Sequence, residues 1–446
     1  MILKKPELTT DTCKNLLAYY RDFHRKNLEF FISLRTQWHA ANPGKHFPGL
    51  CANINPLTGS FRPASEQRAW GWGDTRALGV WCSFFIMNRV PDDLIHDLSH
   101  YCDTLYVSLV EKLKKNHGSI PFTASIETNL PDDEPRNRSL GPDEADFSML
   151  FGSNAFMQYG MWMNDQGVFD KGSAMFFKCC AAIAASAFVF NYAKTPPIGR
   201  VHGPRMIALG VIGEVLKSMQ ALGDPWDKHD VRPKLIERAL EYIAYITANH
   251  FRKEPVAFWE FSDEKGGPVK NQAGAIQVDP GHASECAGFI AELAPFLPKA
   301  DRKAVLEIAL AMHLFADRIG FSPKGVMYKS VDLLTGNPLP DTQTVKRTGK
   351  PTAPWWNVRE HCAAALRLYT LTKDNRCVVS YKKAQNASYQ YYPSHIFPGM
   401  MVQTLDPETL EVVDVPPATG NIDAMHDPRA RVREMENLEL LIQQAS

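Results

Sequence analysis

Two histidines stand beside sequence signals that begin a helix. His282 follows Asp279, Pro280 and Gly281, where proline and glycine end the preceding loop and either the aspartate or the glycine can cap the helix. His426 precedes an Asp-Pro-Arg run that marks another helix start. An imidazole titrates near neutral pH, so a histidine in such a place can act as a general acid or base. The alternatives are a histidine that only helps to cap its helix for His282 and, favoured when that motif is taken alone, an ordinary helix start for His426.

Charged side chains accompany both histidines. Glu285 comes three residues after His282, so the two side chains share a helix face and can touch. Arg429 comes three residues after His426. The alternatives are a surface acid that matches the helix dipole for Glu285 and a solvated side chain for Arg429.

Tryptophans mark two further helix starts. Trp355 and Trp356 follow a proline, and they either anchor the core or stack on the apolar face of a sugar ring whose hydroxyls Glu360 binds. Arg76 follows the run Trp-Gly-Trp-Gly-Asp-Thr at the start of the second predicted helix. It either pairs with an acid or places a fixed cation beside a substrate oxygen.

Motifs that define several other kinds of site are missing from the sequence. It contains no H-E-x-x-H zinc motif, no phosphate loop, no dinucleotide fingerprint after a strand and no G-x-S-x-G elbow. The nine cysteines, Cys51 among them, are scattered and include no C-x-x-C pair, which indicates buried free thiols in a reducing compartment. We therefore expect neither a metal nor a cofactor.

Helical periodicity dominates the chain and predicts an all-α fold. No Gly/Ser-rich or Pro-rich linker interrupts it, and the strand-like runs VMYKSV, MVQTLD and LEVVDV are short enough for hairpins in loops. We expect one domain over residues 1–446, a double ring of helices with long loops and short hairpins at one end. The predicted helices cover residues 10–39, 74–90, 93–115, 146–163, 171–193, 204–222, 231–250, 281–297, 300–319, 355–373, 376–390 and 428–444.

Composition excludes several partners. The 446 residues are 45% hydrophobic and carry 49 basic and 49 acidic side chains, so a binder of nucleic acid, which needs a basic face, is not expected. No apolar run approaches the ~20 residues that span a bilayer. The N-terminus MILKKPELTT lacks the apolar segment of a secretory signal. We expect a cytoplasmic protein that contacts no membrane.

The order of these motifs resembles the N-acylglucosamine 2-epimerase family, which includes acylglucosamine 2-epimerases, mannose isomerases and cellobiose 2-epimerases. The resemblance runs over essentially the whole chain, from FPGLCANINPLTG to the last helix. It implies an (α/α)6 barrel whose cleft binds a reducing sugar, and homodimers are usual in the family. After Arg76, the motifs that carry it are GPRMIALGVIGEVLK, FWEFSDEKGG, DPGHASE, PWWNVRE and HDPRARVREMENLELL.

The resemblance also implies roles for individual residues. His282 and His426 correspond to the two acid/base histidines, and Arg76 to the arginine that anchors the substrate. Glu285 and Glu360 correspond to carboxylates that support the histidines and bind hydroxyls.

Two further positions of the family pattern stand apart. Glu260, in FWEF, matches a family glutamate in the loop after the seventh helix. Arg205 lies where members that act on disaccharides tend to show a histidine close by. It either faces the cleft, beside a charged or differently substituted sugar, or pairs with a neighbour at the helix start.

The chemistry that this set of residues suits is proton transfer at carbon 2 of an open-chain sugar. The neighbouring carbonyl makes that hydrogen acidic, because an enediolate takes up the charge. Two bases on opposite faces give a 2-epimerase, and one base that returns the proton to carbon 1 gives an aldose–ketose isomerase. The alternatives are a glycoside hydrolase or polysaccharide lyase on the same barrel, which for inverting hydrolysis needs an opposed carboxylate pair, and a non-catalytic sugar-binding or partner-binding barrel.

Overall fold

The computed structural model describes most of the chain in long continuous stretches. Most of the stretch FPGLCANINPLTG, including Cys51, lies outside the described residues. The other eight cysteines are buried and unbridged, as expected. The described residues are 3, 8–43, 54, 58–61, 63, 67–134, 137, 139–191, 199–340, 349–401, 404–413 and 424–445.

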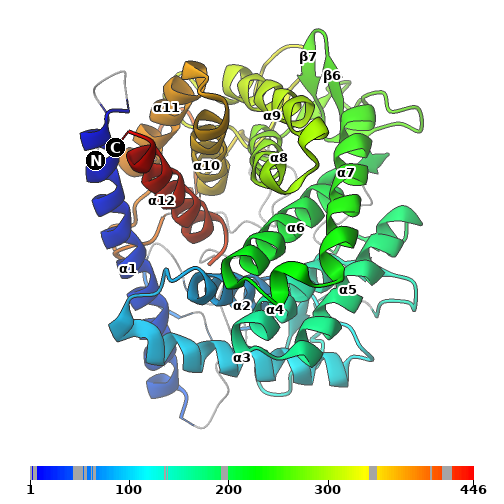
Figure 1. The fold of residues 1–446 in the computed structure, drawn as a ribbon, viewed down its shortest axis with the longest axis vertical. Helices are drawn as coiled ribbons and strands as arrows, with labels where there is room; N and C mark the ends of the chain where they lie inside the picture. Colours follow the sequence, from blue (N-terminus) through cyan, green and yellow to red (C-terminus); the bar gives the residue numbers. More distant parts are fainter. Residues whose placement is uncertain are drawn as a thin grey trace.

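Helices alternate along the chain between an inner and an outer ring (Figure 1). The inner helices pack against one another in sequence order, and α1 packs against α12 where the two ends of the ring meet. This confirms the predicted all-α double ring. The inner helices are α2 (Gly71–Ile86), α4 (Phe147–Met163), α6 (Gly203–Leu222), α8 (Pro280–Leu293), α10 (Trp355–Thr372) and α12 (His426–Gln444). The outer helices are α1 (Thr10–Ala41), α3 (Ile95–Lys115), α5 (Gln166–Ala184), α7 (Val231–His250), α9 (Lys299–Gly320) and α11 (Asn375–Tyr391).

The two rings differ in how their side chains are buried. In α4 every residue from Phe147 to Met161 is buried, so this inner helix is surrounded by protein. The outer helix α7 buries one stripe that includes Leu235, Ala239, Tyr242 and Ile246, at the spacing of a single helix face. An outer helix therefore covers the core with one side only, whereas an inner helix is part of it. None of the described helices is long and apolar enough to cross a membrane.

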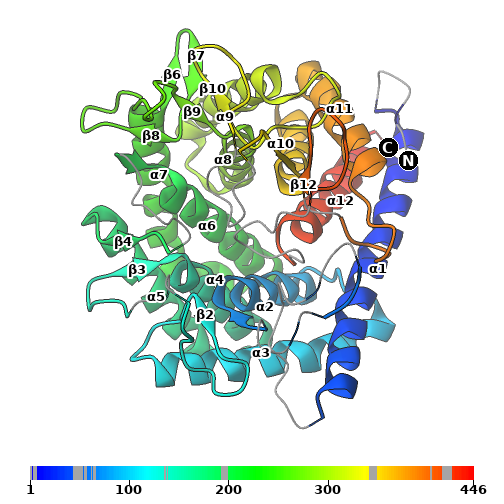
Figure 2. The ribbon, with the colours of Figure 1, turned by 180° about the vertical axis from the view of Figure 1, so that it is seen from behind.

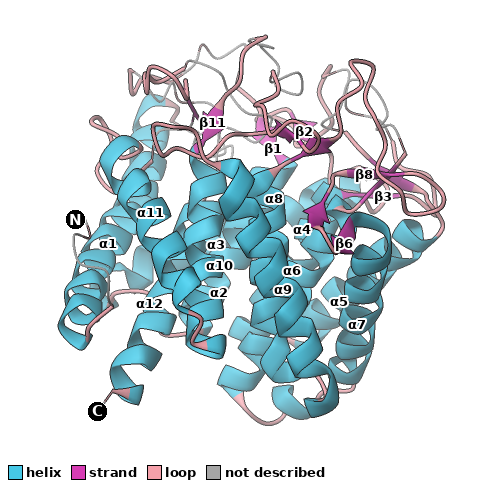
Figure 3. Cartoon of the chain, turned by 90° about the horizontal axis from the view of Figure 1, so that it is seen from above, coloured by secondary structure: helices cyan, strands magenta, loops and turns pink. Residues whose placement is uncertain are grey.

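Short strands gather at the end of the barrel where the inner helices begin (Figures 2 and 3). Five of them directly precede α2, α4, α6, α8 and α10, and each pairs with a strand from another loop. The pairs are β1 (Ala69–Trp70) with β2 (Thr123–Ala124), β3 (Ala145–Asp146) with β4 (Phe188–Val189), β5 (Arg200–Val201) with β8 (Phe261–Ser262), β9 (Gln277–Val278) with β10 (Val331–Asp332), and β11 (Ala353–Pro354) with β12 (Thr404–Leu405). A sixth pair, β6 (Phe251–Lys253) and β7 (Val256–Phe258), forms a hairpin after α7.

The main errors of the sequence prediction concern the fifth helix and the strands. The fifth helix was expected at 171–193, but Asp165 caps it through the backbone N–H of Val168, and it covers Gln166–Ala184. The apolar residues that follow form β4 instead. The runs VMYKSV and MVQTLD contribute to β10 and β12, which pair with β9 and β11 from distant loops in addition to local antiparallel bridges, Val331 with Pro338 and Leu405 with Val412.

His24 in α1 is a buried histidine that the fold holds neutral. Its Nε2 lies 3.0 Å from the carbonyl oxygen of Arg89, and Nδ1 has no partner among the described residues. Burial, reinforced by the positive charge of Arg431, lowers the pKa of His24 to about 3 from the ordinary 6.5. Between these two values the unfolded chain binds more protons than the folded chain, so folding stability rises with pH.

We predict that replacing His24 by Gln makes stability less sensitive to acid. A single such group contributes up to ~1.4 kcal/mol per pH unit below pH 6.5, and glutamine keeps a donor for the Arg89 carbonyl without a titrating ring. Urea unfolding at pH 7 and pH 5 measures this. The same substitution at exposed His96 is the control. An equal loss of stability on acidification in all three proteins would contradict the prediction.

Candidate active site

His282 lies in the first turn of α8, as expected, and Asp279 rather than Gly281 is the residue that caps the helix. Asp279 Oδ1 accepts the backbone N–H groups of Gly281 at 2.9 Å and His282 at 3.2 Å. Asn357 of α10 donates to the same oxygen at 3.2 Å. A Cβ on Gly281 would stand 2.4 Å from the Asn357 amide carbon, so a glycine is required there.

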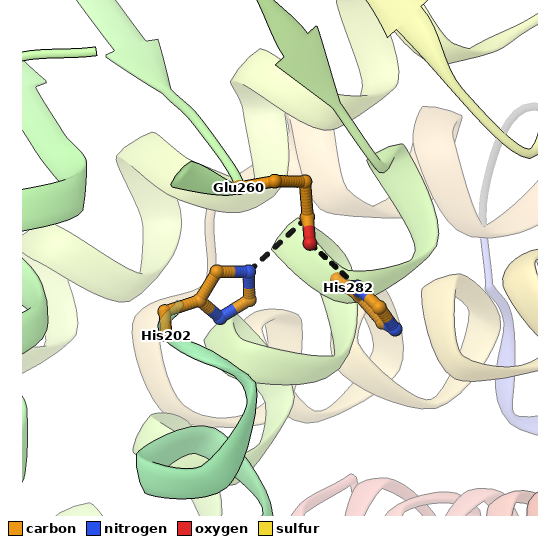
Figure 4. Close-up of side chains that lie close together, drawn as sticks. All are labelled: His202, Glu260 and His282. Carbon is orange, nitrogen blue, oxygen red and sulfur yellow. Dashed lines mark hydrogen bonds and ion pairs between the residues drawn. The ribbon is translucent and has the colours of Figure 1, made fainter. Parts of the chain in front are cut away.

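Glu260 holds the ring of His282 and joins it to a second histidine (Figure 4). Its Oε2 lies 3.1 Å from His282 Nδ1, and its Oε1 lies 3.1 Å from His202 Nε2. When both rings donate N–H to this carboxylate, the lone pair of His282 is on Nε2. The His202 ring is fully buried, while the His282 side chain is 29% exposed. The Glu260–His202–His282 cluster therefore presents one imidazole to a ligand and shields the other.

The charges around His282 work against one another. Burial lowers the pKa of His282, but the carboxylates of Asp279 and Glu260 outweigh it, so the pKa lies above the ordinary value. Lys329 opposes this rise and is ion-paired with Asp279. Although burial alone would raise the pKa of Glu260, the imidazoles of His202 and His282 hold it well below the usual range.

A second cluster surrounds His426 at the start of α12. His426 Nδ1 lies 2.9 Å from Glu360 Oε1 and 3.9 Å from Glu285 Oε1. Arg429 Nη2 donates to Glu360 Oε1 at 2.6 Å and to Glu285 Oε1 at 3.0 Å, and its Nη1 donates to Glu214 at 3.2 Å. All five side chains are at least nine-tenths buried. Arg429 is thus the internal counterion of three carboxylates, not a solvated residue.

Trp356 brings the two clusters together. Its ring centroid lies 5.2 Å from that of His282 and 5.3 Å from that of His426. Lys329 Nζ stands 4.6 Å from the same centroid. Trp355 contacts His426 from another direction, with its ring 5.9 Å away and nearly perpendicular. The two histidines predicted from separate helix starts therefore contact the same indole.

Two of the predicted residues, Glu285 and Arg205, are held by neighbouring helices. Glu285 has no contact with His282 in the described structure, because it faces α12 and pairs with Arg429. Arg205 lies over the ring of Tyr245 at 3.5 Å and donates to the carbonyl of Ile183, so it points to the outer helices α7 and α5.

Arg76 remains at the loop end of α2. Its guanidinium lies over the ring of Phe151 at 4.2 Å and over that of Trp72 at 5.3 Å. These contacts fix the side chain against aromatic surfaces at the end of the barrel where the inner helices begin.

His202, Asp279 and Lys329 were not singled out from the sequence. His202 directly precedes the Gly-Pro pair that begins α6, and the same kind of helix-start signal had selected His282 and His426. Asp279 was considered only as a cap. Lys329 sits in a loop just before β10, where no local pattern distinguishes it from other lysines.

Comparison with known proteins confirms the family resemblance. The model of the N-acylglucosamine 2-epimerase (GlcNAc 2-epimerase) family matches residues 226–425. No curated protein sequence matches the chain. The family match supports an isomerase-type enzyme that acts on carbohydrate.

Solved structures with the same architecture share little sequence with this chain. A cellobiose 2-epimerase from Bacillus thermoamylovorans B4167 has a TM-score of 0.66 at 13% identity, over 92% of this chain and 98% of its own. A sugar epimerase from a ruminal bacterium has a TM-score of 0.67 at 13% identity, over 94% of this chain and 98% of its own. A D-mannose isomerase has a TM-score of 0.63 at 15% identity, over 91% of this chain and 97% of its own. At these identities the likeness shows the (α/α)6 fold.

We predict that Arg429→Met destabilises the protein by about 3–5 kcal/mol, because it leaves buried carboxylates without a counterion. Urea unfolding measures the loss. Arg376→Met, which breaks an ion pair whose arginine is 67% exposed, is the control and changes stability by less than about 1 kcal/mol. Adding Glu360→Gln to Arg429→Met restores part of the loss. A loss at Arg429 no larger than the control's would contradict this account.

Proposed function

We propose that this chain, a carbohydrate enzyme whose residues 226–425 carry the N-acylglucosamine 2-epimerase pattern, is a sugar 2-epimerase or aldose–ketose isomerase. Its substrate would be a reducing sugar or an N-acylhexosamine. The observation that carries the proposal is the pair of imidazoles, each held through Nδ1 by a buried carboxylate, on one tryptophan. A carboxylate on one ring nitrogen orients the ring and strengthens the other nitrogen as a base.

The reaction that fits is proton transfer at carbon 2 of the open-chain sugar. One imidazole takes the proton through Nε2, the C–H electron pair forms the carbon 1–carbon 2 double bond, and the carbonyl oxygen becomes the enediolate oxygen. If the other histidine returns a proton to the opposite face of carbon 2, the product is the epimer. If a proton is returned to carbon 1, while the hydroxyl proton of oxygen 2 moves to oxygen 1, the product is the ketose. We assign these acid/base roles to His282 and His426.

Other residues support this step in different ways. We propose that Arg76 stabilises the developing oxyanion, because a guanidinium is a permanent cation. Glu260 orients His282, and Glu360 orients His426. Glu285 acts on His426 rather than on His282, through Arg429 and the shared cluster. Trp356 and Trp355 form the wall against which the sugar lies.

Carbohydrate hydrolysis fits the described site less well. Glu260, Glu285 and Glu360 each hold an imidazole or a guanidinium. An inverting hydrolase instead needs one carboxylic acid on the leaving oxygen and an opposed carboxylate on a water molecule. The cytoplasmic location and the homodimer stay predictions of the sequence.

We predict that His282→Gln and His426→Gln each lower turnover by about 10²–10⁴-fold, because each removes a proton carrier. Incubation with a panel of aldoses and N-acylhexosamines in heavy water, followed by NMR, reports substrate, product and deuterium at carbon 2 together. Circular dichroism checks that the helices remain.

His395→Gln, at an exposed loop histidine, is the matched control and keeps full exchange. Full activity in both active-site variants would overturn the assignment. A shortened oligosaccharide as product would indicate hydrolysis or elimination instead. Sugar binding without solvent exchange at any carbon would indicate a non-catalytic barrel.

A further inference from the structure

Glu260 is a buried carboxylate whose described partners are imidazoles rather than permanent cations. It is 5% exposed and contacts His202, His282 and the backbone N–H of Asp279. Over the described part of the chain, no lysine or arginine is ion-paired with it. A buried carboxylate needs a compensating positive charge. Here that charge is either a proton on an imidazole or a cation bound between the rings.

The three side chains have the donor set and the spacing of a metal site. Each imidazole nitrogen lies 3.1 Å from one oxygen of the Glu260 carboxylate, His202 Nε2 from Oε1 and His282 Nδ1 from Oε2. One ligand atom from each residue lies within 4.8 Å of the other two. Metal–ligand bonds of ~2.0–2.2 Å in a tetrahedral zinc site put its ligand atoms about 3.3 Å apart. Two histidines and one carboxylate are the protein ligands of many zinc and non-haem iron sites.

Backbone hydrogen bonds hold the three ligands in place. The strand pair β5–β8 aligns Val201 with Phe261, the residues next to His202 and Glu260. The backbone N–H of Glu260 donates to the carbonyl of Gln277 at 3.0 Å, in the strand that leads into α8 and His282. The ligands come from three separate elements, as Figure 4 shows, so the fold itself preorganises the triad.

In the second histidine cluster, an arginine side chain supplies the cation that compensates the buried carboxylates. Glu285, Glu360 and His426 also offer three donor atoms within 4.8 Å of one another. There the guanidinium of Arg429 contacts both carboxylates, at 2.6 Å and 3.0 Å. Arg429 thus occupies the position that a metal ion would take. The Glu260 cluster also offers three donor atoms, two imidazoles and one carboxylate instead of one imidazole and two carboxylates, and it has no such arginine in the described structure.

We propose that His202, Glu260 and His282 bind a divalent first-row transition metal ion of the Zn²⁺ class, with the remaining coordination position toward the more exposed His282 side. His202 Nδ1 has no acceptor in the described structure, so the outer shell that usually stiffens a ligating histidine is incomplete there. The ion is therefore exchangeable and is removed by a chelator.

Metal binding changes the tautomer of His282. A metal on Nδ1 takes the lone pair of that nitrogen, and the proton that Nδ1 gave to Glu260 moves to Nε2. The imidazole then has no lone pair left for the proton on carbon 2. The bound ion consequently inhibits turnover, and this consequence rests on the proposed function, whereas the metal site itself does not.

Cobalt provides a direct test, because Co²⁺ takes the place of Zn²⁺ and absorbs visible light according to its ligands. The full chain, treated with EDTA and dialysed, is titrated with Co²⁺ in the absence of sugar, and Zn²⁺ binding is measured by equilibrium dialysis. We expect one equivalent with a d–d spectrum of low coordination number, displaced by Zn²⁺. Glu260→Gln and His202→Asn each weaken binding by at least 100-fold.

His426→Gln is the matched control, since it alters the other cluster and keeps Co²⁺ binding. Thermal unfolding confirms that each variant is folded. Absence of a stoichiometric site, or binding that survives in both folded Glu260→Gln and His202→Asn, overturns the inference. Zn²⁺ binding that depends on Glu260, in a protein without exchange at carbon 2, leaves the metal site standing and removes the proposed function. Deuterium exchange at carbon 2 in a protein that binds no metal leaves the proposed function standing and removes the metal site.

Discussion

Negative charge buried at the end of the barrel where the inner helices begin is the constraint on which the site depends. Glu260, Glu285 and Glu360 are each at most 5% exposed, and a carboxylate taken out of water costs several kcal/mol unless it is compensated. Arg429 compensates two of them and Glu214 besides. Glu260 has imidazoles instead. The two halves of the site are therefore electrically different, although both contain a histidine and a carboxylate.

Because of this difference, the two histidines lie in different electrostatic environments. Arg429 keeps the carboxylate beside His426 compensated whatever the protonation state of that ring. Beside His282, the carboxylate is compensated only when a proton or another cation resides in the cluster. The inner helices begin at this end of the barrel, and the partial positive charge at their N-terminal ends favours negative charge at the same place.

Local signals in the sequence were enough to place the helices and the two histidines, but not their partners. His202, His282 and His426 all stand at or next to a helix start, where caps, prolines and glycines can be recognised within a few residues. The contacts that define the clusters join positions far apart: Arg429 and Glu285 are separated by 144 residues, and Glu260 and His202 by 58. Helix periodicity made Glu285 a neighbour of His282, yet it does not say which inner helix that face meets. Only packing against α12 decides this.

Either of two cations can compensate the charge of Glu260, a protonated imidazole or a bound metal ion. An imidazole nitrogen that donates a proton to a carboxylate and one that donates a lone pair to a metal occupy nearly the same position, and both arrangements neutralise the acid. What separates them is where the remaining ring proton goes. With the proton on Nδ1, the Nε2 atom of His282 carries a lone pair, and with the proton on Nε2 it is a hydrogen-bond donor. A buried carboxylate whose partners are imidazoles is thus also disposed to bind a metal ion, whereas in the other half of the barrel Arg429 supplies a permanent cation.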